Sequence, residues 1–322
     1  MRLRRHIWRG LTLSAIFALP AGAASDAEAQ LARELGLLPD SAAPAVQTLL
    51  PTESSFALGQ MRNERVLEAR IATRFNIKRM FQERGIRYPA AEMFLRIFKR
   101  ERAMELWVRA DGSAAFELLK TYDICALAGE LGPKQRQGDS QVPEGFYAVD
   151  FFNPESDYLL SLHVDYPNAR DRSNAPAALN LGGDIYIHGG CNSDGCVAVT
   201  DEGVMELYWM AVEARAAGQQ TIPVHIFPAR LETDALQRLQ RVFAQEPELG
   251  AFWASLKAGY DFFEQNRRLP AVMVDGRGDY VVVGAAANAS VRVASLAGPN
   301  AGPRGTPSVP QRPPPLGTPA GN

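Results

Sequence analysis

The spacing of the hydrophobic positions changes twice along the chain. Up to about residue 90 they recur at intervals of three and four, which predicts helices, and Gly85 with Pro89 ends that run. The stretch MFLRIFKRERAMELWVRADGSAAFELLKTYDI then alternates apolar and polar residues on both sides of Asp111-Gly112, which predicts a β-hairpin. The positions that carry the helical spacing are Leu67, Ile71, Phe75, Ile77, Met80 and Phe81.

The next hundred residues are rich in predicted strands. Four stretches each predict one strand, namely GFYAVDFF, YLLSLHVDY, GDIYIHG and TIPVHIF. A helix is predicted from just after Thr200, which with Asp201 offers N-cap chemistry, to about Gly218. Helical spacing returns after Pro228, and AVMVDGRGDYVVVG predicts a short hairpin.

These patterns predict an α+β fold with a β-rich domain at its centre. We place that domain at residues 91–230. A helical segment over residues 24–90 precedes it, and a helical extension with a short hairpin over residues 231–290 follows it. The last segment, residues 291–322, is predicted to be disordered because it is rich in proline and poor in apolar bulk.

The first 23 residues predict a secretory signal peptide. They comprise the basic stretch MRLRRHIWRG, the short apolar run LTLSAIFAL and the small-residue cleavage signal AGA. The apolar run is too short to span a bilayer, although an uncleaved signal that anchors the protein in the inner membrane is the alternative. We therefore expect a periplasmic protein.

Charge and cysteine content narrow the possible functions. The formal net charge is −2, and removal of the signal peptide makes it −6, because that segment carries four arginines and no acid. A mildly acidic protein argues against a nucleic-acid partner. The only cysteines are Cys125, Cys191 and Cys196, so export to an oxidising compartment leaves at least one free thiol or an intermolecular bond.

The stretch IYIHGGCNSDGCVAVTDEGV concentrates the candidate chemistry. Cys191 and Cys196 lie five residues apart with His188 upstream, a spacing that does not match the ligand pairs of structural zinc. No metal and no cofactor are therefore predicted. The two histidines on other predicted strands, His163 and His225, are interpreted as structural residues.

A cysteine nucleophile explains this stretch better. Cys196 follows Gly195 and precedes a predicted helix, whose N-terminal dipole favours a thiolate and so a lowered pKa. His188 ends a predicted strand, and Gly189-Gly190 allows its imidazole to face Cys196 as a base. Backbone N–H groups around Gly195 and Cys196 then offer an oxyanion hole. The alternative is a glycine-rich turn with buried, inert cysteines.

The motif IHGGCNSDGC, together with LGPKQRQGDSQVPEGFYAVD, resembles the L,D-transpeptidase (YkuD-type) catalytic domain family. Within it the sequence is similar to the YafK-like branch of Gram-negative murein L,D-transpeptidases, which YPNARDR and FPAR also match. The resemblance covers residues 60 to 285, approximately. It implies a β-rich catalytic domain of L,D-transpeptidase type, flanked by N- and C-terminal helices and acting on peptidoglycan.

The resemblance also implies roles for five residues of this motif. Cys196 is expected to be the nucleophile and His188 its general base, and Gly189 is expected to hold the histidine through its carbonyl. Ser193 and Gly195 are expected to shape the oxyanion turn.

Two departures from the wider family affect substrate binding. Asp194 stands where a histidine is usual, and Ala198 stands where arginine or asparagine is common. Another cation must then meet the substrate carboxylates, and Arg170 and Arg172 are the candidates because guanidinium groups bind carboxylates bidentately. The alternative is that both are surface arginines or partners of Asp165 and Asp171.

For several side chains near the motif, the sequence leaves two alternative roles open. Lys134, Asp139 and Glu144 either line the donor groove or are solvated loop residues, and none is expected to be catalytic. Cys191 either pairs with Cys125, which leaves Cys196 as the single free thiol, or remains reduced. A redox pair of Cys191 with Cys196 is less favoured because oxidation would silence the nucleophile.

The predicted function is that of a cell-wall cysteine enzyme of L,D-transpeptidase type. It acts through a thioester on stem peptides that contain meso-diaminopimelate, and it resolves the thioester with an amine. One alternative is a hydrolase of the same fold that cleaves lipoprotein–peptidoglycan or L,D links. A second alternative is a non-catalytic peptidoglycan-binding module. The expected partners are peptidoglycan stem peptides and a wall-linked lipoprotein.

Overall fold

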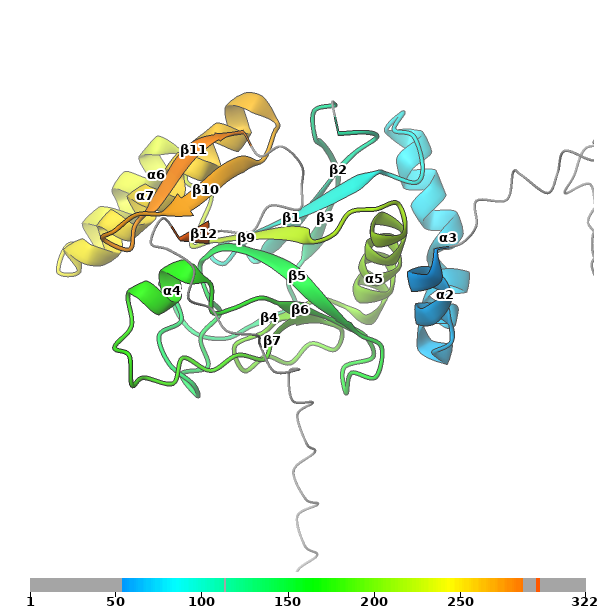
Figure 1. Cartoon of the computed structure of the whole chain (residues 1–322), viewed down its shortest axis with the longest axis horizontal. Coiled ribbons are helices and arrows are strands. Elements are labelled where there is room, and N and C mark those ends of the chain that lie inside the picture. The colour runs from blue at the N-terminus through cyan, green and yellow to red at the C-terminus, as the bar shows by residue number, and fades with distance from the viewer. Residues whose placement is uncertain (1–53, 113, 286–293, 296–322) are drawn as a thin grey trace, which may run out of the picture. The chain divides into compact units, whose positions relative to one another are not determined.

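A mixed β-sheet of nine strands forms the centre of the molecule (Figure 1). The structure is a computed structural model and describes residues 54–112, 114–285 and 294–295. The strand order across the sheet is β3-β2-β1-β9-β5-β6-β7-β8-β4. The strands are β1 (Glu92–Phe98), β2 (Ala103–Arg109), β3 (Glu117–Asp123), β4 (Ala126–Leu127), β5 (Gly145–Asn153), β6 (Ser161–Val164), β7 (Ile185–His188), β8 (Val197–Ala198) and β9 (Ile222–Phe227).

Helices and a second, smaller sheet surround this sheet, which confirms the predicted α+β class with flanking helices. The small sheet has the order β11-β10-β12. The remaining elements are α2 (Ser55–Met61), α3 (Glu64–Glu83), α4 (Ala169–Ser173), α5 (Asp201–Ala216), α6 (Thr233–Val242), α7 (Pro247–Asn266), β10 (Pro270–Val274), β11 (Tyr280–Ala285) and β12 (Ala294–Ser295).

Hydrophobic cores lie on both faces of the central sheet. Alternate residues of β9 enter different cores, since Ile226 packs in the core that includes α3 and α5, whereas Phe227 packs in the core that includes α6 and α7. Figure 1 shows α2, α3 and α5 together on one side of the sheet and α6, α7 and β10–β11 on the other. Strands covered on both faces are buried along almost their whole length, as β1, β2 and β9 are.

Helix α5 begins where the sequence predicts it to begin. The Thr200 side chain accepts a hydrogen bond from the N–H of Gly203 at 3.1 Å, and Asp201 and Glu202 occupy the first turn, where acids complement the helix dipole. The helix ends at Ala216 and Gly218 follows it with φ +107°. This helix therefore places a fixed N-terminus directly after β8.

The structure confirms one prediction for the first half of the chain and adds detail to another. Strands β2 and β3 pair antiparallel on either side of Asp111-Gly112 and form the predicted hairpin, and the polar run Lys99–Arg102 makes a further turn that joins β1 to β2. In α3 the stripe of Leu67, Ile71 and Phe75 is exposed. The helix buries Ile77 and Phe81 of the predicted positions, together with Val66, Ala69 and Thr73.

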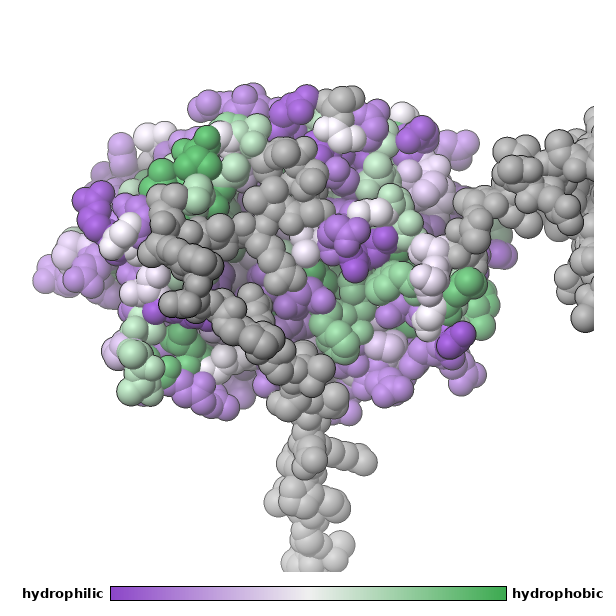
Figure 2. All heavy atoms as spheres, viewed as in Figure 1, coloured by the Kyte–Doolittle hydropathy of each residue, from purple (hydrophilic) through white to green (hydrophobic). Residues whose placement is uncertain are grey.

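Other exposed apolar side chains lie at the edges of the molecule. On the face drawn in Figure 2, hydrophobic residues gather over β11 and over α2. Val281 and Val283 on β11 and Leu58 on α2 are exposed. The predicted signal peptide lies outside the described residues, and so does the proline-rich tail apart from β12.

Candidate active site

His188 and Cys196 lie at the two ends of the segment that joins β7 to β8, and these two short strands pair in parallel. Strand β7 pairs with β8 in parallel, with Ile187 opposite Val197 and His188 opposite Ala198. Extending this register by one residue places Cys196 beside Tyr186. Because residues two apart on a strand share a face, Tyr186 and His188 carry their side chains on the same face. We call residues His188–Cys196, where the sequence predicts catalysis, the catalytic turn.

The imidazole of His188 is buried and held in one tautomer. Its Nδ1 lies 2.6 Å from the carbonyl oxygen of Gly189, and a carbonyl only accepts, so Nδ1 carries the proton and Nε2 keeps its lone pair. The ring of Tyr158 stacks on the imidazole at 4.4 Å between centroids. Burial lowers the pKa of His188, although the hydrogen bond to Gly189 acts in the opposite direction. The imidazole is thus neutral at pH 7.

The thiol of Cys196 is half-buried and protonated. It donates a hydrogen bond to the carbonyl oxygen of Asp184 at 3.6 Å. Burial raises the pKa of the Cys196 thiol to about 11, and the charges of Asp184 and Asp194 contribute in the same direction. The expectation of a lowered pKa is therefore wrong, because burial outweighs the dipole of α5, whose first residue lies five positions further on.

A disulfide anchors the catalytic turn to the edge of the sheet. Cys125 and Cys191 are bonded, with their Cα atoms 5.3 Å apart, and Cys196 is the one free cysteine of the three in the chain. The backbone N–H of Cys125 also donates to the carbonyl of Ala198 at 3.0 Å, which continues the pairing of β4 with β8. The odd cysteine count thus leaves a single thiol at the turn.

Ser193 and the glycines of the turn have local packing roles. Ser193 Oγ donates to the carbonyl of Cys196 at 2.7 Å and accepts the N–H of Ala128 at 3.2 Å. Gly195 has φ +105°, and a Cβ there would lie 3.3 Å from the carbonyl oxygen of Gln141. A Cβ on Gly189 would lie 2.7 Å from a carboxylate oxygen of Asp201, so this position has no room for a side chain.

The loop ahead of β5 is tied to the core by one buried carboxylate. Glu144 is fully buried and accepts the N–H of Gly132 at 2.6 Å and the indole N–H of Trp253 at 2.8 Å. Lys99 lies 3.0 Å from the same carboxylate and donates to the carbonyls of Gly132 and Val142, each at 2.9 Å. Glu144 is therefore a buried anchor rather than a solvated loop residue.

Lys134 and Asp139 form a second tie within this loop. Their side chains make an ion pair, and the Lys134 ammonium also donates to the carbonyl of Arg136 at 2.9 Å. Burial opposes ionisation of Asp139, but hydrogen bonds from Lys134 and from three backbone N–H groups lower its pKa. Lys134 also acts electrostatically on Cys196, where it favours the thiolate. The loop thus places one cation near the thiol.

The two candidate arginines lie in different environments. Arg170 is buried, with its guanidinium carbon 3.8 Å from the ring centroid of Phe252, and its Nε has no hydrogen-bond partner among the described residues. Arg172 is exposed and is not part of the pocket that Arg170 lines. Both charges act to lower the pKa of Asp171, yet burial prevails and raises that pKa to about 6. Asp165 accepts the N–H of Ala148 at 2.8 Å.

Sequence reasoning missed three residues that contact the catalytic turn. Tyr158 stacks on His188, Gln141 packs against Gly195, and the carbonyl of Asp184 accepts the Cys196 thiol. The spacing of residues carries no signal for the first two, since they lie in loops far upstream. Within the part of the chain that the structure describes, no three or more His, Cys, Asp or Glu side chains are grouped to hold a metal ion.

The histidines on the neighbouring strands have other partners. His163 Nδ1 lies 2.6 Å from a carboxylate oxygen of Asp150. His225 is buried between the rings of Phe94 and Phe146, at 4.5 and 4.7 Å between centroids, and burial lowers its pKa well below the usual value. Both histidines are structural residues in this fold.

Comparisons with known proteins place this site in a family. Residues 95–226 match the model of the YkuD L,D-transpeptidase catalytic domain, a range that begins within β1, ends within β9 and includes both His188 and Cys196. Over 193 residues the chain is 40% identical to the protein named "Putative L,D-transpeptidase YafK" from Escherichia coli strain K12 and to its counterpart from strain O157:H7. These matches cover 59% of this chain and 73% of each relative. The chain belongs to the L,D-transpeptidase (YkuD-type) family.

Solved structures of more distant proteins also match. The helical cell shape determining protein Pgp2 from Campylobacter jejuni is 21% identical with a TM-score of 0.34, and the match covers 43% of this chain. Bd1075 from Bdellovibrio bacteriovorus is 21% identical with a TM-score of 0.30, over 44% of this chain. This chain spans about half the length of each, 48% in both cases. Likenesses this weak support no functional statement.

Proposed function

We propose that this protein is a periplasmic cysteine enzyme of L,D-transpeptidase type that acts on peptidoglycan stem peptides containing meso-diaminopimelate. Its family membership supports the cell wall as the site of action. One observation carries the catalytic part of the proposal: the single free thiol of the chain lies on the turn that also holds a buried histidine fixed as the Nδ1–H tautomer. That tautomer leaves Nε2 ready to accept a proton.

The proposed first step is acyl transfer to Cys196. The bond between Sγ and the L-centre carbonyl carbon of a diaminopimelate residue forms while the thiol proton passes to Nε2 of His188. The N–H groups of Gly195 and Cys196 stabilise the oxyanion, for which Ser193 and Gly195 hold the turn. The carbon–nitrogen bond then breaks, and the proton on Nε2 goes to the leaving amine. The product is a thioester on Cys196.

The resting protonation states suit this step. Burial raises the pKa of the Cys196 thiol to about 11 and lowers the pKa of His188, so the pair rests as a neutral thiol and a neutral imidazole. General-base catalysis by His188 is then required at the moment of attack, rather than a preformed thiolate. Gly189 and Tyr158 act as positioning residues, because each contacts the imidazole of His188, through a hydrogen bond and through ring stacking respectively.

An amine or water resolves the thioester. An amine gives a crosslink or a wall-attached protein, and water gives cleavage of an existing link, including a link to a lipoprotein. Both outcomes use the same groups on the enzyme. Arg170 is the proposed ligand of a substrate carboxylate, because it is a buried guanidinium without an ion-pair partner among the described residues. Arg172 is exposed and lies outside the pocket that Arg170 lines, so we propose Arg170 alone as this ligand.

Residues 54–285, apart from residue 113, contain no helix long and apolar enough to cross a bilayer. The proposed periplasmic location depends on the predicted signal peptide in residues 1–23. Fractionation of cells that express the full chain tests this point: the mature protein is expected in the periplasmic fraction with residues 1–23 removed. Recovery of the uncut chain with the inner membrane would instead establish an anchored enzyme.

The enzymatic proposal is tested on purified sacculi in water enriched in oxygen-18. Sacculi with L,D crosslinks and bound lipoprotein are incubated with the protein, and the muropeptides are analysed by mass spectrometry. New crosslinks or exchanged terminal residues without label indicate transfer, whereas lost links with label in the new carboxylate indicate hydrolysis. Cys196→Ala and His188→Gln are expected to abolish either change, and His163→Gln on the neighbouring strand serves as the histidine control. Identical profiles for the unmodified protein and Cys196→Ala would leave only a binding module.

A further inference from the structure

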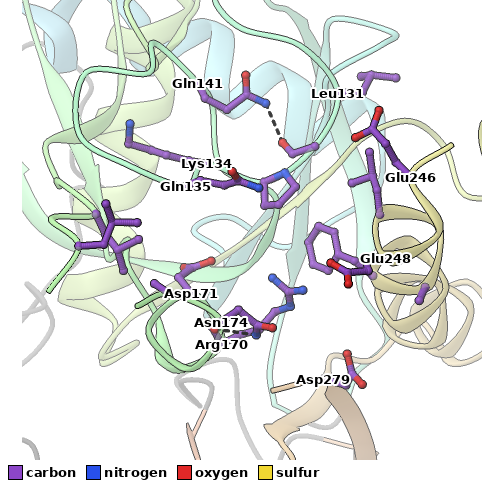
Figure 3. A pocket seen from close by; sticks show the side chains of 18 of the residues that line it. Leu131, Lys134, Gln135, Gln141, Arg170, Asp171, Asn174, Glu246, Glu248 and Asp279 are labelled. Carbon is purple, nitrogen blue, oxygen red and sulfur yellow. Dashed lines mark hydrogen bonds between the residues drawn. The ribbon is translucent and has the colours of Figure 1, made fainter. Parts of the chain in front are cut away.

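A pocket of about 890 Å³ lies between α4, the loop ahead of β5 and the start of α7 (Figure 3). This volume is in the range of small-molecule sites. Its wall includes Lys134 and Gln141, which also face the catalytic turn: Lys134 acts electrostatically on Cys196, and the backbone of Gln141 packs against Gly195. The pocket and the catalytic turn therefore share one loop. We call this hollow the Arg170 pocket.

Arg170 is the unusual feature of this pocket. The residue is 8% exposed, and its guanidinium points into the hollow in Figure 3. The guanidinium lies over the rings of Phe252 and Tyr280, at 3.8 and 5.7 Å, and acts electrostatically on Asp171, but its Nε lacks a hydrogen-bond partner among the described residues. A buried charge without a hydrogen-bonded counter-ion is costly, so this guanidinium is poised for an anionic ligand.

Carboxylates line the opposite side of the same pocket. Figure 3 shows Glu246, Glu248 and Asp279 on one side of the hollow, with the Arg170 guanidinium between them and Asp171. Within the described part of the chain, none of these three carboxylates forms an ion pair. A pocket with an unpaired guanidinium and unpaired carboxylates offers partners for both an anion and a cation.

We propose that the Arg170 pocket binds a free α-amino acid end group, with its carboxylate on Arg170 and its ammonium facing Glu246, Glu248 and Asp279. This inference rests on the proposed function, because a meso-diaminopimelate residue carries such a zwitterion at the stereocentre opposite the one that Cys196 attacks. The shared loop places the pocket beside the reacting end of that residue. The pocket thus selects stem peptides whose side arm ends in both charges.

Binding to Cys196→Ala protein tests the proposal without turnover. Three probes of similar length are titrated by calorimetry: meso-diaminopimelate with both charges at each end, pimelate with carboxylates alone, and cadaverine with amines alone. Diaminopimelate is expected to bind at least roughly tenfold more tightly than either of the others, as two charge-assisted contacts predict. Equal binding of pimelate would reduce the pocket to an anion site, and absence of binding up to about 10 mM would also overturn the proposal.

Matched variants locate the probe. Arg170→Gln and the exposed double variant Glu246→Gln/Glu248→Gln are each expected to weaken diaminopimelate binding roughly tenfold. Arg172→Gln on the same helix is expected to leave that binding unchanged. If Arg170→Gln loses its fold by circular dichroism, Arg170→Lys and the glutamate double variant replace it. Equal loss in Arg172→Gln and Arg170→Gln would contradict the assignment of the carboxylate to Arg170.

Different results would contradict the proposed enzymatic function and the proposed zwitterion pocket. Arg170-dependent binding of diaminopimelate by a protein that leaves sacculi unchanged would sustain the zwitterion pocket and remove the enzymatic function. Processed sacculi, together with diaminopimelate binding that ignores Arg170, would sustain the enzyme and remove the pocket. Amidation of the free diaminopimelate carboxylate in a soluble stem peptide gives a further readout: kcat/KM is expected to fall roughly tenfold in the unmodified protein and to change little in Arg170→Gln.

Discussion

The catalytic turn and the Arg170 pocket adjoin the same loop, but they differ in whether their polar groups have hydrogen-bond partners within the protein. In the turn, His188, Ser193 and the Cys196 thiol each have a hydrogen-bond partner, and a disulfide ties the segment to the sheet. In the pocket, the Nε of Arg170 has none among the described residues. The polar groups of the turn therefore find their partners within the protein, whereas the guanidinium of the pocket leaves a donor for a ligand.

A similar contrast separates two of the buried cations, Lys99 and Arg170. Lys99 has the Glu144 carboxylate and two carbonyl oxygens within 3.0 Å, which matches the three donors of an ammonium group. Arg170 has five donors and stacks on aromatic rings instead. A cation with all its partners in the protein holds the fold, and a cation without them is available to a ligand.

Removal of Lys99 is expected to cause the largest loss of stability. Lys99→Met leaves Glu144 buried with its charge uncompensated, so the free energy of unfolding should fall by about 3–5 kcal/mol. Chemical denaturation of the purified protein measures it. Lys99→Met/Glu144→Gln removes both charges and should recover part of the loss. A loss below about 1 kcal/mol for the single variant would show that the pair does not hold the loop.

Removal of the disulfide is expected to have the next largest effect. The bond closes a segment with a sequence separation of 66 residues, and Cys125→Ser/Cys191→Ser should lower the free energy of unfolding by about 2–4 kcal/mol. Denaturation of this variant beside the oxidised parent gives the value. Reduction of the parent by a thiol reagent should reproduce it. An unchanged midpoint in both cases would mean that the hydrogen bonds of β4 with β8 suffice to fix the turn.

Local patterns predicted the fold well, because most helices and strands can be predicted from a short stretch of sequence. The strand pattern of TIPVHIF became β9 and the cap at Thr200 became the start of α5. The helical spacing of Leu67, Ile71 and Phe75 identified α3 but not its packed face, since α3 leaves these three side chains exposed and buries others such as Ile77 and Phe81. Spacing alone does not report which face of a helix meets its neighbour when both faces carry apolar residues.

The site was predicted less completely, for physical reasons that differ between its parts. The Gly-rich spacing around His188 and Cys196 is local and therefore visible in the sequence. The raised pKa of Cys196 comes from burial, which is set by the surrounding fold, so the expected direction was wrong. The Arg170 pocket combines segments near residues 131, 170 and 248, and no local pattern shows that they meet.

The pH dependence of Cys196 alkylation tests whether the thiol of the catalytic turn rests in its protonated form. Because burial raises its thiol pKa from 9.0 to about 11, the thiolate at pH 7 should be about 100-fold scarcer than for a thiol at 9.0, and alkylation by iodoacetamide correspondingly slower. The alkylation rate is followed by mass spectrometry and should keep rising above pH 9. Asp194→Asn removes a charge that raises this pKa and should move the curve to lower pH. A plateau below pH 8 would instead indicate a resting thiolate–imidazolium pair.

Substitution of Arg170 is expected to change the free energy of unfolding least among these variants, although it is expected to weaken ligand binding. Arg170→Gln gives up a cation–π contact worth about 1–2 kcal/mol but also relieves the burial of an unpaired charge, so the free energy of unfolding should change by less than about 1 kcal/mol. Arg96→Gln is the matched comparison. Arg96 is more deeply buried, at 1% exposed against 8% for Arg170, and two of its nitrogens also lack a hydrogen-bond partner among the described residues. Unlike Arg170 it lies 2.7 Å from Glu264 and 3.5 Å from Glu105, so its loss should cost about 3 kcal/mol or more. Chemical denaturation of both variants decides the matter: if Arg170→Gln is as unstable as Arg96→Gln, Arg170 holds the fold, and the distinction between the pocket and its surroundings disappears.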